Sequence, residues 1–289
     1  MPSLKSLKIR IASVKSTQKI TKAMQLISAS RLYRAREALF ASIPYYNEMQ
    51  SIMSAVIPKY ARNAGWLGPM VQNNGGDKYL VIIATSDRGL CGGFNASIVR
   101  KARTFLSELI AQNKKIHVIF LGKKGYELLR TFCPFESCKV YNNPKEVSFC
   151  DALRIAAKIL AAFQDEQFNV CKMIYSEFIS TIQQRVMHEQ LIPVCSDSFD
   201  IDSGDIVHSY EPSIEELHEQ IIPRYIAIQI YHVLLENAAS EHSARMVAMD
   251  GATRNSTKMI QRLKNIYNRT RQASITRELT EIIAGAQAV

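Results

Sequence analysis

The amino-acid sequence predicts an α/β protein that combines a long antiparallel coiled coil of the N- and C-terminal helices with a central, doubly wound, mostly parallel α/β domain. Two long segments nearly free of Gly and Pro, residues 3–57 and 224–284, predict the helices. The segment between them alternates short apolar runs with helix-like runs, which is typical of a parallel sheet covered by helices. The 289 residues suffice for about two domains, and we expect segment boundaries at 1–60, 61–212 and 213–289.

The N-terminal segment carries an apolar seam. Apolar residues recur every three or four positions from Leu4 to Val14, as in a coiled-coil helix. The polar Gln18 and Thr21 are expected to interrupt this seam. It is then expected to resume at five positions: Met24, Ile27, Leu32, Ala35 and Leu39. Pro44 removes one backbone donor, so we expect a kink there rather than the end of the helix.

The C-terminal segment is too long to be covered by its own domain. Sixty helical residues span roughly 90 Å, whereas a compact domain of the size of the middle segment measures roughly 35–40 Å. Small residues are concentrated between Ala238 and Ala252, where they allow two helix backbones to approach closely. We therefore expect the N-terminal helix to pack antiparallel against this zone. The imperfect heptads predict an irregular coiled coil.

The middle segment contains the expected sheet. Each apolar run is short, rich in β-branched residues and followed by a helix-like or turn-forming segment. The expected strands are residues 79–85, 115–122, 138–142, 169–178 and 185–194, the last of them an edge strand. The expected helices are residues 96–113, 123–132 and 147–163.

The positive charge is concentrated in the two terminal segments. The formal net charge is +10, divided as +8 for residues 1–60, −2 for 61–223 and +4 for 224–289. No apolar run of about 18 residues predicts a membrane span, and the basic N-terminus has no secretory apolar region. We therefore expect the six cysteines to be free thiols, although Cys133 and Cys138 are close enough in sequence for a disulfide.

One loop, Ser86 to Asn95, is the candidate site of an alternative function, that of a nucleotide- or phosphate-binding α/β enzyme. Residues 86–95, SDRGLCGGFN, follow the first strand, where doubly wound folds bind ligands. Neither the P-loop nor the G-x-G-x-x-G spacing is present, so a structural turn or partner contact is favoured over a phosphate site. Cys91 is a weaker candidate nucleophile, because no histidine motif accompanies it. We expect no catalytic residue, cofactor or metal, and we expect His232 and His242 to face solvent or a partner.

The basic N-terminal helix allows two further interpretations. Its lysines and arginines could contact nucleic acid, or the helix could lie on a membrane surface. Its charges, however, share the same turns as the apolar seam, unlike those of a basic leucine zipper. A solvated or partner-facing surface is favoured, and we expect no nucleic-acid partner. Binding of nucleic acid that weakens steeply with salt would reverse this expectation.

Three blocks of the sequence carry a resemblance to a known family. They are IASVKSTQKITKAMQLISASRL, TSDRGLCGGFN, and ENAASEHSARMVAMDGATRN with the terminal YNRTRQASITRELTEIIAGAQAV. Together they resemble the gamma-subunit family of F-type ATP synthase over the whole chain. The resemblance implies a non-catalytic rotor shaft inside the alpha–beta hexamer, with its α/β head against epsilon and the ring of c subunits. Such a shaft couples proton flow to the conformational cycling of the catalytic beta subunits.

The resemblance also implies contact residues and a location. By motif match, the rotor–stator contacts are Met24, Arg245, Gln272 and Thr276. Met24 is equally consistent with the coiled-coil core. Asp250 stands where a Lys is also found, and the regulatory cysteine insertion has no counterpart, so redox control through Cys195 is not expected. The chain begins almost directly with the shaft helix, which favours the cytoplasmic face of a bacterial inner membrane, peripherally bound, over the matrix side of the mitochondrial inner membrane.

Overall fold

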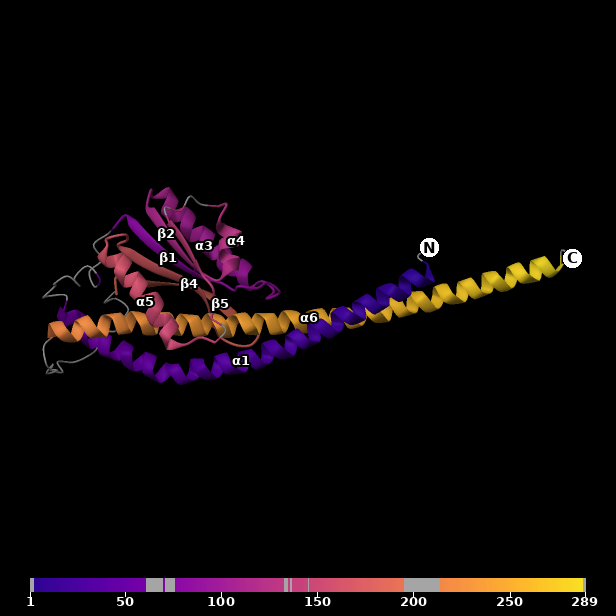
Figure 1. Cartoon of the computed structure of the whole chain (residues 1–289), viewed down its shortest axis with the longest axis horizontal. Helices are drawn as coiled ribbons and strands as arrows, with labels where there is room; N and C mark the ends of the chain where they lie inside the picture. Colours follow the sequence, from indigo (N-terminus) through magenta and orange to yellow (C-terminus); the bar gives the residue numbers. More distant parts are fainter. Residues whose placement is uncertain are drawn as a thin grey trace. The chain divides into compact units, whose positions relative to one another are not determined.

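The computed structural model describes residues 3–60, 70, 76–132, 135, 137–144, 146–194 and 214–287. Helices and strands alternate through the middle of the chain, as the sequence predicts. The elements, drawn in Figure 1, are α1 (Leu4–Tyr60), β1 (Lys78–Ala84), α3 (Phe94–Ala111), β2 (Lys115–Leu121), α4 (Lys123–Leu129), β3 (Ser137–Tyr141), α5 (Phe149–Gln164), β4 (Val170–Phe178), β5 (Gln184–Ile192) and α6 (Ile214–Gln287).

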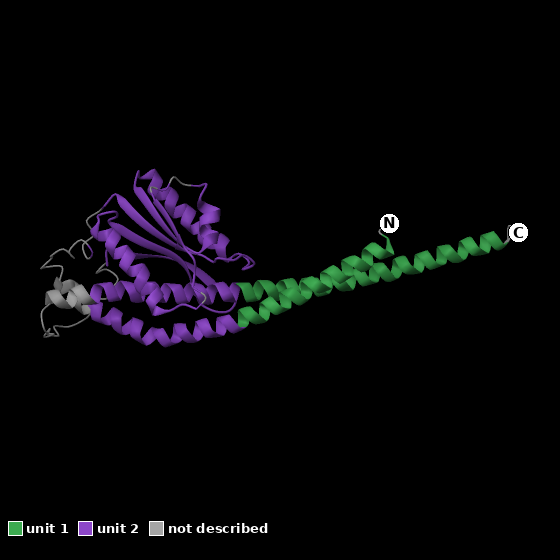
Figure 2. Ribbon diagram, viewed as in Figure 1, with its two compact units in different colours: residues 1–29, 245–289 green, residues 30–244 purple. Residues whose placement is uncertain are grey.

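The chain divides into two compact units, shown in Figure 2. Unit 1 contains residues 1–29 and 245–289, and unit 2 contains residues 30–244. The long helices α1, of 57 residues, and α6, of 74 residues, each contribute to both units. No helix of the described residues has an apolar segment long enough to cross a membrane.

The sheet of unit 2 has the order β3-β2-β1-β4-β5. The pairs β3–β2, β2–β1 and β1–β4 are parallel, and β5 is an antiparallel edge strand. Side chains of β1 alternate between the two faces because successive Cβ atoms of a strand point to opposite sides. Leu80, Ile82 and Ala84 enter one core, and Val81 and Ile83 enter the other. The predicted fold class, long terminal helices with a mostly parallel central sheet, is confirmed.

Helices cover both faces of this sheet. Helices α3 and α4 supply apolar side chains to one core, and α5 with the unit 2 parts of α1 and α6 supply the other. A capping box between Ser148 and Asp151 begins α5. Helix α1 continues through Pro44 without a break and curves in this part, as Figure 1 shows.

Unit 1 is an antiparallel helix pair with regular heptads. The half-buried and buried positions of α6 from Thr253 to Ser274 alternate in steps of three and four. Across the pair, Gln18 Nε2 donates to Thr257 Oγ1 at 2.7 Å, Thr21 and Thr253 share a hydroxyl hydrogen bond of 2.8 Å, and Gln25 Nε2 donates to Asp250 Oδ1 at 2.9 Å. The partner numbers fall as those of α1 rise, which establishes the antiparallel direction.

The expected interruption of the α1 seam is therefore wrong. Gln18 and Thr21 continue the seam, because a helix returns the same face every seven residues whatever side chain stands there. Their polar groups are satisfied by threonines of α6. Ile27, expected to resume the seam, is instead 54% exposed.

The small residues of α6 have a second partner that the sequence did not predict. In unit 2, Ser240 Oγ donates to the carbonyl of Ser176 at 3.0 Å, and Ser243 Oγ donates to that of Thr181 at 2.6 Å. Ala239, Ser240 and Ser243 are completely buried. This part of the small-residue zone thus brings α6 close to the end of β4 and the turn that follows it.

Candidate functional site

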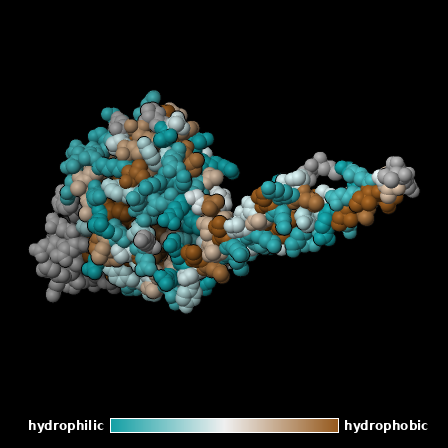
Figure 3. Space-filling model, turned by 45° about the vertical axis from the view of Figure 1, so that its right-hand side comes forward, coloured by the Kyte–Doolittle hydropathy of each residue, from teal (hydrophilic) through white to brown (hydrophobic). Residues whose placement is uncertain are grey.

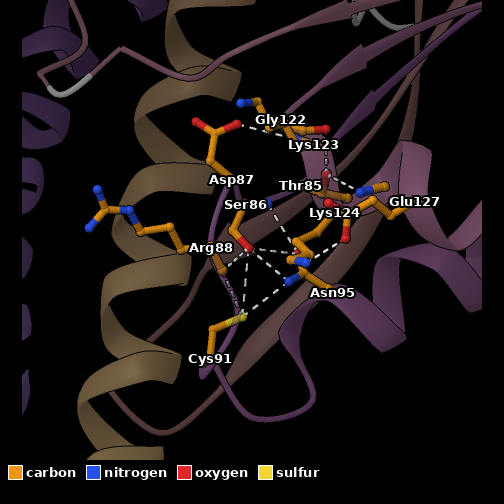
Figure 4. A network of polar contacts seen from close by, with 11 residues as sticks. Thr85, Ser86, Asp87, Arg88, Cys91, Asn95, Gly122, Lys123, Lys124 and Glu127 are labelled. Carbon is orange, nitrogen blue, oxygen red and sulfur yellow. Dashed lines mark hydrogen bonds and ion pairs between the residues drawn. The ribbon is translucent and has the colours of Figure 1, made fainter.

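The loop after β1 is closed by its own hydrogen bonds. Ser86 Oγ donates to the carbonyl of Arg88 at 2.7 Å and accepts from Asn95 Nδ2 at 2.7 Å, while the Ser86 N–H donates to Asn95 Oδ1 at 3.0 Å. Asn95 Nδ2 also lies 3.2 Å from Cys91 Sγ. Figure 4 shows these side chains pointing toward one another, whereas Arg88 points away. The polar groups of Ser86 and Asn95 that point into the loop are therefore used in hydrogen bonds within the loop itself.

Asp87 fills the position that an anion would need. Its carboxylate accepts the N–H of Lys123, at the first turn of α4, at 3.1 Å and the N–H of Asn143 at 2.9 Å. Asn143 Nδ2 donates in turn to the carbonyl of Thr85 at 2.7 Å. Phosphate sites at this edge of a sheet use free backbone N–H groups. Here a carboxylate already accepts two of them, so the geometry does not favour the phosphate-site alternative.

Cys91 has no base in its hydrogen-bonding environment. The contacts described for its sulfur are with Ser86 Oγ, the carbonyl of Arg88 and Asn95 Nδ2. A cysteine nucleophile needs a proton acceptor or a cationic neighbour to form its thiolate, and none of these groups supplies either. Cys91, Cys138, Cys150 and Cys171 are free thiols. Cys133 and Cys195 lie outside the described residues, as does any disulfide between Cys133 and Cys138.

The tip of this loop is exposed and apolar. Leu90 is 62% exposed and has a φ of 64°. A left-handed conformation costs a non-glycine residue roughly 1–2 kcal/mol. Leu90 thus combines a strained backbone with an apolar side chain in solvent, and strained residues are concentrated at functional sites.

A buried polar cluster lies where α1, α6 and the sheet meet in unit 2. The ring of His232 stacks on that of Tyr46 with centroids 4.2 Å apart, and the Glu236 carboxylate accepts the Phe178 N–H. Burial lowers the pKa of His232, and burial raises the pKa of Glu236. The expectation that His232 faces solvent or a partner is wrong, because this histidine packs inside the chain.

The four predicted contact residues do not form one site. Met24 is half-buried at the edge of the α1 seam, and its carbonyl accepts from Ser28 Oγ at 2.8 Å. Arg245 is only 8% exposed and is engaged in a contact within the chain. Gln272 lies 27 positions further along α6, or roughly 40 Å at helical rise. Gln272 and Thr276 are both exposed, one turn apart, and Thr276 Oγ1 donates to the Gln272 carbonyl at 3.0 Å.

The last part of α6 exposes apolar side chains that motif matching did not identify. All residues from 275 to 286 are exposed. The seam ends near Ser274 because α1 begins at Leu4, which the register Gln18–Thr257 places close to residue 271. Four large apolar side chains therefore have no cover from α1: Ile275, Leu279, Ile282 and Ile283, exposed by 48, 55, 67 and 57%. The sequence did contain a signal for these residues. The apolar periodicity of the C-terminal helix continues further than the N-terminal helix is long enough to cover.

Unit 1 is also strongly basic. Residues 1–29 carry six basic and no acidic side chains, and residues 245–289 carry eight basic and three acidic ones. Figure 3 shows hydrophilic and hydrophobic side chains interspersed along the surface of the helix pair. Exposed apolar side chains mark a surface for protein interaction, and a strong excess of one charge favours a partner of opposite charge.

These features define a structural subunit of a larger assembly. A family model described as ATP synthase matches residues 3–289. The chain is 43% identical to the ATP synthase gamma chain of Sinorhizobium medicae (strain WSM419) and 45% identical to that of Brucella ovis (strain ATCC 25840 / 63/290 / NCTC 10512), in both cases over all of this chain and all of the relative.

Solved structures agree with these sequence comparisons. A chain in the cryo-EM structure of the Tetrahymena thermophila mitochondrial ATP synthase central stalk and c-ring matches with a TM-score of 0.56 and 26% identity, covering 81% of this chain and 99% of that one. A chain of the Euglena gracilis mitochondrial ATP synthase has the same fold, with a TM-score of 0.54, 22% identity and coverage of 90% and 95%. The present chain belongs to the family of ATP synthase gamma subunits. The prediction of a non-catalytic subunit is confirmed by this membership.

Proposed function

We propose that the chain is the rotor of the F-type ATP synthase central stalk and couples proton flow through the membrane ring to the conformational cycling of the catalytic beta subunits. The observation that carries this proposal is the end of α6, where residues 275–286 are exposed and include four large apolar side chains. Exposed apolar side chains gathered on one segment mark a surface for a protein partner. The family to which the chain belongs supports the alpha–beta hexamer as that partner.

A rotor must contact the three beta subunits unequally. A ligand shifts a conformational equilibrium only through a difference in its affinity for the two states, and the same holds for a shaft acting on its surroundings. The helix pair meets this requirement because it is not symmetric about its own axis. As far as residue 274, α6 is paired with α1, and beyond residue 274 the surface belongs to α6 alone.

The contact residues act at two levels of the shaft. We assign Gln272 and Thr276 to the upper level, since both are exposed on successive turns of α6. Met24 and Arg245 belong to the lower level and are partly or largely buried in the free chain. Arg245 must therefore move its guanidinium outward, or share its present contact, to reach a carboxylate of the stator. Gln272 needs no rearrangement.

The remaining partners follow from the same proposal. The central α/β domain contacts the epsilon subunit and the ring of c subunits, so that the chain is a peripheral component of the membrane complex. Bacterial relatives of full length support the cytoplasmic face of the inner membrane as its location. Residues 1–60 and 213–289 form the shaft, and 61–212 form the head.

The test is reconstitution from separate subunits. The full chain mixed with alpha and beta subunits is expected to form a complex that hydrolyses ATP, whereas the isolated chain hydrolyses none. Leu279→Asp combined with Ile283→Asp places two charges on one face of the exposed segment and is expected to reduce the fraction of chain that assembles.

The matched control is Thr280→Asp combined with Ala284→Asp, which adds the same charge one position along α6. This variant is expected to assemble more completely than the first. An isolated chain that hydrolyses ATP as a monomer contradicts the proposal, and so does failure of the unaltered chain to bind the hexamer.

A further inference from the structure

The turn between β4 and β5 presents an apolar side chain that no described residue covers to any large extent. Ile182 is 83% exposed, the largest fraction among the large hydrophobic residues described, and Ile179 beside it is 46% exposed. Isolated exposed apolar residues are common on protein surfaces. What distinguishes this turn is how firmly the side chain is held and what surrounds it.

Hydrogen bonds fix the turn from inside and from outside. Within it, the Ser180 N–H donates to the Gln183 carbonyl at 2.9 Å, and Ser180 Oγ accepts the Gln183 N–H at 3.0 Å. From outside, the buried Ser243 of α6 donates to the Thr181 carbonyl at 2.6 Å. A side chain presented on an ordered backbone loses little conformational entropy when it binds.

The turn has an apolar neighbour at the same edge of the sheet. β1 and β4 are adjacent and parallel, so the segments that follow them leave at one edge, as Figure 1 shows. The segment after β1 carries Leu90, which is 62% exposed and conformationally strained. This edge therefore presents two apolar tips, Leu90 and Ile182.

The turn is free of charge in a basic protein. Residues 178–184 contain no charged side chain, although the chain has a net charge of +10. The nearest charges in sequence, Glu177 and Arg185, form an ion pair of 2.8 Å, and the Glu236 carboxylate of α6 accepts the N–H of Phe178 at the end of β4. An acidic partner would gain nothing at this tip, whereas an apolar one would remove the Ile182 side chain from water.

We propose that the β4–β5 turn is a docking site that inserts the Ile182 side chain into an apolar pocket on the alpha–beta hexamer. The turn is fastened to Ser243, close to the end of the unit 2 part of α6, and from Arg245 the same helix continues into the segment proposed to enter the hexamer. The inference rests on that proposed function. It adds a contact outside the helix pair, made by the sheet.

The experiment uses the full chain in the assembled complex with the photo-crosslinking amino acid benzoylphenylalanine at position 182. Irradiation is expected to join the chain to an alpha or beta subunit. The control position is Ile110, which is 39% exposed at the end of α3 and lies at the opposite edge of the sheet; there no alpha or beta adduct is expected. Ile182→Asp is expected to weaken binding of the hexamer severalfold more than Ile110→Asp.

Folding of each variant is checked by thermal unfolding, and Ile182→Gln provides a variant without charge that is expected to weaken binding in the same direction. Adducts from position 182 only to the ring, to epsilon or to a second copy of this chain overturn the inference, and so does equal binding by the Ile182 and Ile110 variants. If the unaltered chain binds no hexamer, the rotor proposal falls as well. If every Ile182 variant binds the hexamer as well as the unaltered chain does, only the proposal that the β4–β5 turn is a docking site is refuted.

Discussion

At the scale of single residues, Asp87 connects three segments at the carboxyl edge of the sheet. It follows β1, accepts the N–H of Lys123 at the start of α4 and accepts that of Asn143 after β3. The loop could be located in the sequence from its glycines, but this role could not. Both partners are more than 35 positions away, and their positions depend on the order of the strands.

Replacing Asp87 tests this structural interpretation of the loop. Asp87→Ala leaves two backbone N–H groups without their acceptor and is expected to lower the free energy of unfolding by about 1–2 kcal/mol. Asp87→Asn keeps one carbonyl oxygen and is expected to cost less. Urea titration of both variants gives the comparison. Equal stability of Asp87→Ala and the unaltered chain would show that these hydrogen bonds contribute nothing.

His188 gives unit 2 a dependence on pH. Burial, with Lys172 and Lys101 nearby, lowers the pKa of His188 to about 4. Between about pH 6.5 and 4 the unfolded chain therefore binds a proton that the folded chain does not, so this histidine's contribution to stability is complete above pH 6.5 and is lost as the pH falls. The half-buried Glu189 and the buried Glu236 have pKa values raised by burial and act in the opposite direction.

The measurement is the free energy of unfolding as a function of pH for the unaltered chain and His188→Gln. The variant is expected to lose less stability between pH 6.5 and 4, because glutamine does not titrate. The comparison cancels the contributions of the two glutamates. Parallel curves for the two proteins would mean that His188 is protonated equally in the folded and unfolded states.

At the scale of elements, the seam of α6 determines which apolar residues stabilise the helix pair. Leu263 lies in the seam and is 8% exposed, whereas Met259, one turn earlier, is 48% exposed. Leu263→Ala is expected to destabilise unit 1 by about 2–3 kcal/mol, and Met259→Ala by less than about 0.5 kcal/mol. Amide hydrogen exchange along residues 249–274 reports both, and equally fast exchange in the two variants would refute the assigned seam.

Much of the fold could be predicted from local pattern, and the failures involve long-range partners. β1 and β2 were predicted within one or two residues because a strand buried on both faces is a continuous apolar run. The seam failed at Gln18 and Thr21, since only the partner helix shows that Thr257 and Thr253 satisfy them. Ile182 lies between two predicted strands, and only the structure of the turn shows how far its side chain is exposed.

At the scale of the whole molecule, the positive charge belongs to the two segments of unit 1. They carry fourteen basic side chains and three acidic ones. The β4–β5 turn of unit 2, residues 178–184, carries no charged side chain. We expect these charges to steer association with the proposed hexamer partner, and apolar contacts to hold the bound complex together.

The rate of association is expected to fall about tenfold or more from low salt to about 0.5 M salt, because exposed charges are screened. The dissociation rate is expected to change less. Stopped-flow measurements with alpha–beta hexamers give both constants. An association rate independent of salt would contradict charge steering, and comparable binding to a nucleic-acid duplex would show that the basic surface is not selective.

The central claim is that this chain turns inside the hexamer. The most direct measurement fixes the hexamer to a surface, attaches an optical probe to unit 2 and records the probe while ATP is hydrolysed. The account predicts stepwise rotation in one direction that stops when ATP is withdrawn. Full ATP hydrolysis with a probe that is bound but does not rotate would contradict it.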